Sequence, residues 1–383
     1  MEPQTAKSSD IPRLIEEVPL CNSSSRPDTL VIGANPESAK LASFPAFDWL
    51  RIVLASVVVL GHEGVTFPGP IDGQLAVEVF FALSGWLIGG ILLETDRAEL
   101  PRFFFNRATR IWIPYAAAVA LLYGFAAVYE GVDMFWVKYL FFDTTFTHQI
   151  FTHFPRAGHE MPLAGSGNQF WSISVEEQFY LVAPIVILLP FGRKILPWVA
   201  IAVLLLVGGV LGTPIAFGVI AAILKRSFGD WQIKPRTRMA VAAVTLAIFG
   251  ILFMHDDSGL RALFAIGLVL TLAVPGKRNT IPVFLGGISY PVYLNHWVGA
   301  FVAHGVTRHL VHASEGNPAS NALYVAIAYP FSLIIGAIAY FLIDRQVLAR
   351  RQFWFKPRRG ILCGATAYIL VISGLIGGAL IAW

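Results

Sequence analysis

The amino-acid sequence predicts an all-α polytopic membrane protein with about ten to eleven transmembrane helices. Of its 383 residues, 56% are hydrophobic and only 14% are charged, which is too apolar for a soluble globular domain. Apolar runs of roughly 17–25 residues recur from residue 44 onward, and a helix of that length crosses ~30 Å of hydrocarbon. The lysine and arginine residues also alternate between successive loops, as they do in membrane proteins.

The predicted transmembrane segments follow one another with short connections. We expect them at 44–62, 74–93, 111–129, 171–190, 194–211, 213–228, 238–254, 260–275, 281–303, 322–343 and 361–382. The segments at 213–228 and 260–275 are short for a full crossing, so ten crossings remain an alternative. Residues 1–43 lack a sustained apolar period, so we expect a disordered cytoplasmic tail there and one membrane-embedded domain at 44–383.

Charge placement predicts the orientation. With the N-terminus in the cytoplasm, 23 of the 28 Lys and Arg residues fall in inner segments and 4 in outer segments, while Arg51 lies inside the first span. This asymmetry follows the positive-inside rule. The excess of basic over acidic residues therefore comes from membrane anchors and requires no nucleic-acid partner. The two cysteines, Cys21 and Cys363, lie far apart in the chain and indicate neither a disulfide framework nor a metal site.

The first predicted span carries two ionisable residues, Arg51 and His62. They are eleven residues apart, so they project from one helix face with ~16 Å between them along the helix axis. Asp48 precedes Arg51 by three residues and can pair with it. An interfacial anchor beside Trp49 would explain Asp48 and Arg51 equally well. His62 is followed by Glu63, and ionisable groups at such positions usually have a partner or a function.

Three later stretches add further charge to the predicted membrane domain. Glu78 lies in the second span, Arg107 and Arg110 share a helix face at the inner surface, and "WSISVEEQFY" places Glu176 and Glu177 at the start of a span. Purely structural roles remain open for all of them. The arginines can serve as topological anchors, and the glutamates can stabilise a helix N-terminus.

Several motifs occur together and in order: the eleven-residue Arg-to-His spacing, "FFALSG", "NRATRIWIPY", "WSISVEEQFY" and "ISYPVYLNHW". As a set they resemble the acyltransferase 3 family of bacterial integral-membrane O-acyltransferases, over about residues 44–343. The resemblance implies transfer of an acyl group, commonly acetyl from acetyl-CoA, to hydroxyl groups of carbohydrates such as surface polysaccharides or glycolipids. It also implies a location in the bacterial cytoplasmic (inner) membrane, among lipid.

O-acyl transfer requires a base for the acceptor hydroxyl, and histidine suits that task near neutral pH. We therefore expect His62 to act as the base, with Glu78, Glu176 or Glu177 holding its tautomer. All four residues fall at the outer end of their spans, so they could share one chamber with His296. Which glutamate partners His62 stays open. The inner residues Glu94 and Asp344 are not expected in that chamber.

Acyl-CoA is the expected donor, and no permanently bound cofactor or metal is expected. Arg107, Arg110 and Arg51 are the candidates for binding its phosphates on the cytoplasmic side. The acceptor would enter from outside past the long connection at 130–170, whose histidines (His148, His153 and His159) have no metal-ligand spacing and are expected to be non-catalytic. A multi-pass transporter with a proton relay is the alternative function, although the sequence shows no inverted repeat.

Overall fold

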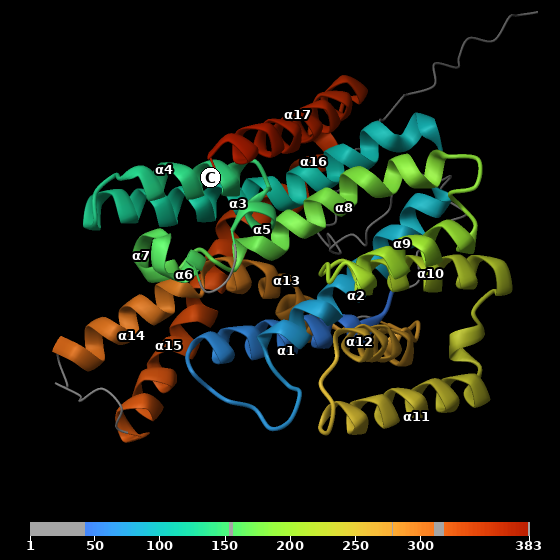
Figure 1. Cartoon of the computed structure of the whole chain (residues 1–383), viewed down its shortest axis with the longest axis horizontal. Coiled ribbons are helices and arrows are strands. Elements are labelled where there is room, and N and C mark those ends of the chain that lie inside the picture. The colour runs from blue at the N-terminus through green and yellow to red at the C-terminus, as the bar shows by residue number, and fades with distance from the viewer. Residues whose placement is uncertain (1–42, 153–155, 278, 310–317, 382–383) are drawn as a thin grey trace, which may run out of the picture. The chain divides into compact units, whose positions relative to one another are not determined.

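The structure, a computed structural model, describes residues 43–152, 156–277, 279–309 and 318–381. These residues form helices and contain no strand, which confirms the predicted all-α class (Figure 1). The predicted tail lies outside the described residues except for Ser43. The main helices are α1 (Pro45–His62), α2 (Gly73–Glu94), α3 (Leu100–Tyr129), α4 (Met134–Thr144), α8 (Phe170–Leu188), α9 (Ile195–Val207), α10 (Thr213–Phe228), α11 (Pro235–Leu252), α12 (Ser258–Leu272), α13 (Thr280–Asn295), α14 (Trp297–His309), α15 (Pro318–Ala339), α16 (Arg345–Trp354) and α17 (Pro357–Ile381).

Each predicted span coincides with a helix or a pair of helices. In the described residues, seven helices are long and apolar enough to cross a membrane, and the apolar helices α9 and α12 are shorter. The protein is therefore polytopic, while the count of ten to eleven crossings stays a prediction. Two boundaries differ from the sequence expectation. Helix α3 starts eleven residues before the predicted span at 111–129, and the predicted span at 281–303 is divided at His296 into α13 and α14.

Helix α2 occupies the centre of the helical domain. It packs against α10, α1, α12 and α8, and 78% of its most apolar 18-residue stretch is buried. The close approach of α10 depends on glycine: a Cβ on Gly85 would lie 2.9 Å from the carbonyl carbon of Ile215, and a Cβ on Gly218 would lie 2.6 Å from the backbone nitrogen of Trp86. Small residues at such a crossing let two helix backbones come together.

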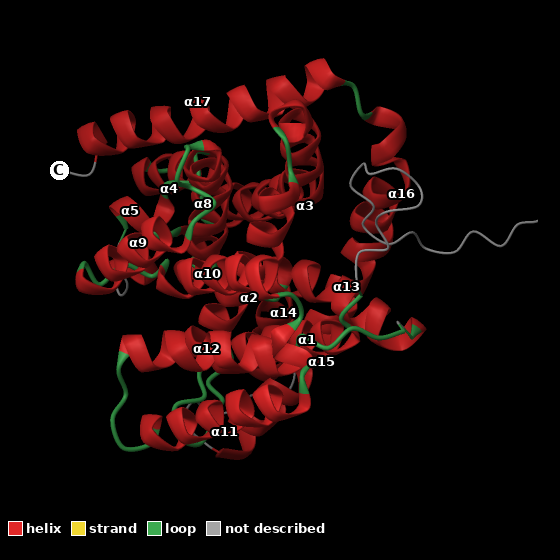
Figure 2. Cartoon of the chain, turned by 90° about the vertical axis from the view of Figure 1, so that its right-hand side faces the viewer, coloured by secondary structure: helices red, strands yellow, loops and turns green. Residues whose placement is uncertain are grey.

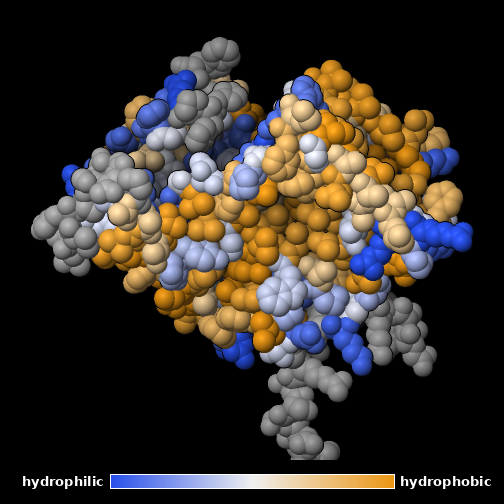
Figure 3. All heavy atoms as spheres, turned by 90° about the horizontal axis from the view of Figure 1, so that it is seen from below, coloured by the Kyte–Doolittle hydropathy of each residue, from blue (hydrophilic) through white to orange (hydrophobic). Residues whose placement is uncertain are grey.

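The peripheral helices present apolar surface to the outside. Only 11% of the most apolar 18-residue stretch of α11 and 22% of that of α17 is buried. Helix α17 runs along one side of the domain against α3 (Figure 2). Figure 3 shows a broad apolar surface on one face, with hydrophilic side chains gathered toward its edges. A soluble protein rarely exposes so much contiguous apolar area, so these faces are the ones that contact lipid.

The connection at 130–170, expected to be an external loop, is largely helical. It contains α4 and three short helices, α5 (His148–Phe151), α6 (Arg156–Glu160) and α7 (Pro162–Gly165). A buried carboxylate holds this segment on the domain: Asp143 accepts a hydrogen bond from Tyr123 of α3 (2.6 Å) and bonds Nδ1 of His148 (2.6 Å). The side chains of Asp143 and His148 are no more than 1% exposed. His148 therefore has a structural position, and His153 lies outside the described residues.

Candidate functional site

The structure brings the two predicted chamber histidines together. His62 is the last residue of α1 and is exposed, whereas His296 lies between α13 and α14 and is only 3% exposed. Their ring centroids are 5.1 Å apart, with 47° between the ring planes. Nδ1 of His296 lies 2.8 Å from the carbonyl oxygen of Tyr293. Because a carbonyl only accepts, Nδ1 carries the hydrogen, and Nε2 of neutral His296 keeps a lone pair.

Packing against α15 fixes the position of His296. Ser332 of α15 donates a hydrogen bond to the His296 carbonyl oxygen (3.0 Å), which also accepts hydrogen bonds from the backbone nitrogens of Gly299 (2.9 Å) and Ala300 (3.3 Å) of α14. A Cβ on Gly299 would lie 2.8 Å from the backbone nitrogen of Ser332, so only glycine allows α14 and α15 to come this close. These contacts fix the backbone of His296, while the Tyr293 carbonyl oxygen orients its imidazole through Nδ1.

Glu63 was not among the predicted site residues, although it lies next to the histidine pair in the chain. It caps the end of α1, is 7% exposed and has one carboxylate oxygen, Oε2, without a hydrogen-bond partner among the described residues. Burial raises the pKa of Glu63, and a hydrogen bond from Tyr324 of α15 opposes that shift. The Tyr324 ring also contacts the ring of His304, with 4.8 Å between centroids. Adjacency to His62 was the sequence signal that could have selected Glu63.

A second polar cluster contains Glu176 and Glu177 of α8. Trp112 of α3 donates a hydrogen bond to Oε2 of Glu177 (2.8 Å), and Glu176 is hydrogen-bonded to Ser84 and Tyr180. Ser84 of α2 and Tyr180 share a further hydrogen bond of 3.0 Å. Three helices therefore meet at these carboxylates, and Oε1 of Glu177 has no partner among the described side chains.

Arg107 belongs to this second cluster. Its guanidinium lies over the Tyr180 ring, 5.8 Å from the centroid, within electrostatic range of Glu176, Glu177 and Arg110. The residue is only 7% exposed, and its Nε and Nη2 groups have no hydrogen-bond partner in the described part of the chain. The sequence expectation placed Arg107 at the inner membrane surface. Arg107 lies in the body of α3, which begins at Leu100, and it is buried in the domain; its place at the inner membrane surface stays a prediction.

The two glutamates therefore lie near Arg107, and a chamber shared with His62 stays a prediction. Asp344, expected to be remote from them, lies near Arg110 and Tyr290, and Tyr290 is near both glutamates. A position along a helix gives depth, but the direction in which a side chain points depends on how the helix packs.

One row of polar side chains connects the two clusters. Ser172, one helical turn before Glu176 on α8, shares a hydrogen bond of 2.6 Å with Tyr293 of α13. The Tyr293 ring lies 6.4 Å from the ring of His296, which in turn contacts His62. Polar groups buried in an apolar domain are costly unless they are paired or functional. This row leads from the carboxylate and arginine cluster to the histidine pair.

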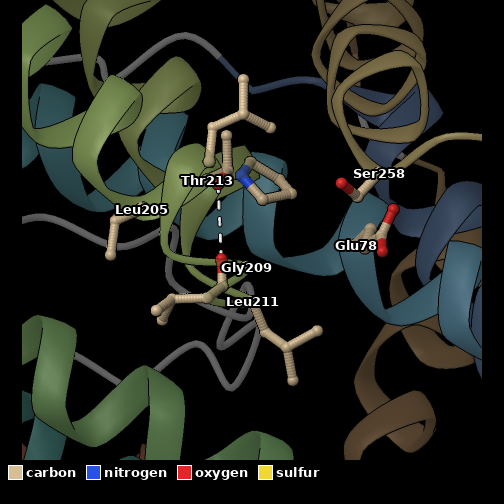
Figure 4. Close-up of a pocket in the computed structure, with 9 residues that line it drawn as sticks. Glu78, Leu205, Gly209, Leu211, Thr213 and Ser258 are labelled. Carbon is tan, nitrogen blue, oxygen red and sulfur yellow. Dashed lines mark hydrogen bonds between the residues drawn. The ribbon is translucent and has the colours of Figure 1, made fainter.

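Glu78 lies in neither cluster. It is 6% exposed, accepts a hydrogen bond from Gln74 (3.1 Å) and has an unpartnered Oε2 among the described residues. It lines a separate cavity of about 40 Å³ with Ser258, Thr213 and leucine side chains of α9 and the α9–α10 connection (Figure 4). Its charged neighbours are Arg261, Asp72 and Asp256, so its nearest electrostatic partners are not the histidines.

Arg51 of α1 contacts Asp48. The two side chains approach to 3.5 Å, and Asp48 is 3% exposed. This is the pairing expected from their spacing. Across 43–152, 156–277, 279–309 and 318–381, no group of three or more His, Cys, Asp or Glu side chains is arranged to hold a metal ion.

Comparison with known proteins agrees with this reading of the motifs. The model of a family described as an acyltransferase domain matches residues 44–341. The peptidoglycan O-acetyltransferase OatA of Listeria monocytogenes is 28% identical over 156 residues, which cover 37% of this chain and 23% of that protein. A Staphylococcus aureus protein named "Putative O-acetyltransferase" is 25% identical over 167 residues, 39% of this chain and 25% of its own. The chain thus spans about a quarter of the length of these relatives, and no solved structure matches it.

Proposed function

We propose that this chain, which belongs to the acyltransferase 3 family, is an integral-membrane O-acyltransferase that transfers an acyl group, most simply acetyl, from acyl-CoA to a carbohydrate hydroxyl. The acceptor would be a cell-surface or exported polysaccharide or a glycolipid. The Listeria relative is named for peptidoglycan, which supports a carbohydrate acceptor of this class. The proposed location is the bacterial cytoplasmic membrane, with the N-terminus in the cytoplasm.

The contact between His62 and His296 carries the proposal. The acceptor oxygen attacks the thioester carbonyl carbon while His62 takes the hydroxyl proton, which gives a tetrahedral oxyanion. When that intermediate collapses, the carbon–sulfur bond breaks, and the CoA thiolate accepts the proton from His62. The free Nε2 of His296 can accept a hydrogen bond from His62. In this arrangement His296 takes the orienting role that a carboxylate has in many triads.

The arginine cluster supports the donor side of the proposal. Coenzyme A carries several phosphates, and guanidinium groups with unmet N–H donors suit phosphate binding. Arg107 supplies such donors inside the domain, beside the row of polar side chains that leads to His296. The ~16 Å between Arg51 and His62 along α1 is comparable to an extended pantetheine arm. A donor bound at the arginines would therefore present its thioester near the histidines.

We infer that the glutamates of α8 act on the arginines. Glu176 and Glu177 lie within electrostatic range of Arg107, where they can orient its guanidinium group. Glu63 and Glu78 lie in separate surroundings. Each keeps one free carboxylate oxygen among the described residues, which is suited to accept a hydrogen bond from a hydroxyl group.

The test is acyl transfer from labelled acetyl-CoA to a panel of oligosaccharides by purified protein in detergent. His62→Ala should lower the rate by ~10²–10⁴, as loss of a general base does. The control is His255→Ala, which changes an exposed histidine in the connection between α11 and α12. Equal rates for wild type and His62→Ala would overturn the assignment of the base. Wild-type protein that turns over no acyl donor but moves a solute across vesicles would be a transporter.

A further inference from the structure

Helix α16 brings a second group of arginines against α3. It follows a π-helical turn, Tyr340–Asp344, at the end of α15, and such turns are frequent at functional sites. The Phe355 ring just after α16 packs on the Phe105 ring of α3, with centroids 5.5 Å apart, and Arg102 lies over the same ring at 5.5 Å. These contacts fix α16 beside the helix that carries Arg107 and Arg110.

Arg351 of α16 points toward this shared surface. Its Nη1 group is buried and has no hydrogen-bond partner among the described residues. Arg351 lies within electrostatic range of Arg102, Arg107 and Arg110. Hydrogen-bond donors left unmet inside a protein are destabilising, and like charges repel one another. Both penalties disappear when an anion binds between the arginines.

Protein carboxylates do not fill this role. None of the four guanidinium groups forms an ion pair with a side chain in the described part of the chain, where the ion pairs involve other residues. Asp344 and the two glutamates of α8 are near, but Asp344 keeps an unpartnered Oδ2. Arg102 and Arg351 are partly exposed, so they remain accessible to a ligand.

We propose that Arg351 joins Arg107 and Arg110 in one site for a ligand with at least two phosphate groups, held between α3 and α16. The inference rests on the proposed function, in which this ligand is the nucleotide end of acyl-CoA. The unmet donors belong to two helices, and a ligand with two phosphate groups offers acceptor oxygens to both. The single phosphate of an anionic lipid headgroup is the other source of an anion at these arginines.

Adenosine 3′,5′-bisphosphate and pyrophosphate are the probes, used with the full chain in neutral detergent. Isothermal calorimetry should show binding by wild type, and Arg351→Ala should weaken it at least tenfold, since charge-assisted hydrogen bonds are lost. Arg350→Ala is the matched control, because the neighbouring Arg350 is exposed, and its affinity should equal that of wild type. Arg351→Lys keeps the charge but loses the planar fork, so it should bind with intermediate affinity.

Equal affinity of wild type, Arg351→Ala and Arg351→Lys for both probes would overturn the site. Wild type that binds neither probe, but whose thermal unfolding is shifted by phosphatidylglycerol in an Arg351-dependent manner, would show that lipid supplies the phosphate and would overturn the nucleotide assignment. Acyl transfer is measured in parallel. Arg351-dependent probe binding without acyl transfer would support the site while refuting the proposed function. Acyl transfer together with probe binding that does not depend on Arg351 would support the proposed function and overturn the site.

Discussion

Replacing Gly85 with alanine should separate α2 from α10 and lower the stability of the protein. The added Cβ would lie 2.9 Å from the carbonyl carbon of Ile215 and closer still to its oxygen. Carbon atoms pack best at about 3.5–4.0 Å, so the helices must move apart by on the order of 1 Å. Overpacking of this kind costs about 1–3 kcal/mol. Backbone atoms cannot rotate away, which places Gly85→Ala at the upper end of that range.

Helix propensity opposes the effect. Alanine is favoured over glycine inside a helix by up to about 1 kcal/mol, so the net loss should be about 2 kcal/mol. The unfolding entropy grows with size, so in a domain of roughly 340 residues a change of that size should lower Tm by about 3 °C. Gly90→Ala on the same helix is the matched control, because no atom lies within 4 Å of its added Cβ. It should leave Tm unchanged or raise it slightly.

The assay is thermal unfolding in detergent, followed by tryptophan fluorescence, with acyl transfer measured on the same samples. Gly85 is adjacent to Ser84, whose hydroxyl contacts Tyr180, so Gly85→Ala should also reduce transfer. Equal Tm values for Gly85→Ala and Gly90→Ala, including an equal loss in both variants, would refute the close contact between α2 and α10.

Three further outcomes are expected. Arg107→Ala should raise the apparent KM for acyl-CoA more than it lowers kcat, because a phosphate contact made equally in ground and transition states affects binding; an unchanged KM would leave Arg107 a structural residue. A cysteine introduced at Asp256 should react with an impermeant thiol reagent in intact cells and one at Lys277 should not, and the opposite labelling would reverse the topology. Partial burial raises the pKa of Glu160, but Lys138 (2.8 Å) and Arg156 outweigh this effect, so the pKa is lowered overall. The ion pairs of Glu160 with Lys138 and Arg156 therefore stabilise the fold at pH values above the unfolded pKa of 4.5. This stabilisation is lost as the pH falls through the folded pKa of Glu160. Glu160→Gln should remove this part of the pH dependence of Tm, and an unaltered profile would contradict it.

The sequence predicted the class of protein and the types of residue in the site. Apolar length and charge asymmetry are properties of segments, so they can be recognised without knowing any contact. They gave the polytopic all-α architecture and the position of every segment that the structure describes as a long apolar helix. The motifs indicated the acyltransferase family, which the match over residues 44–341 confirms, while the roles of His62, Arg107 and Arg110 stay predictions.

Only the tertiary structure decided which ionisable groups meet. His62 contacts His296, 234 positions later in the chain, because α1 packs on α13. Glu177 faces Trp112 and lies near Arg107, while Glu78 points into a cavity between α2, α9 and α12. A regular rise of 1.5 Å per residue fixes the depth of a side chain along its own helix. The rotation of each helix and its neighbours depend on how all the helices pack, through contacts such as Gly85 on Ile215, and local sequence does not contain that information.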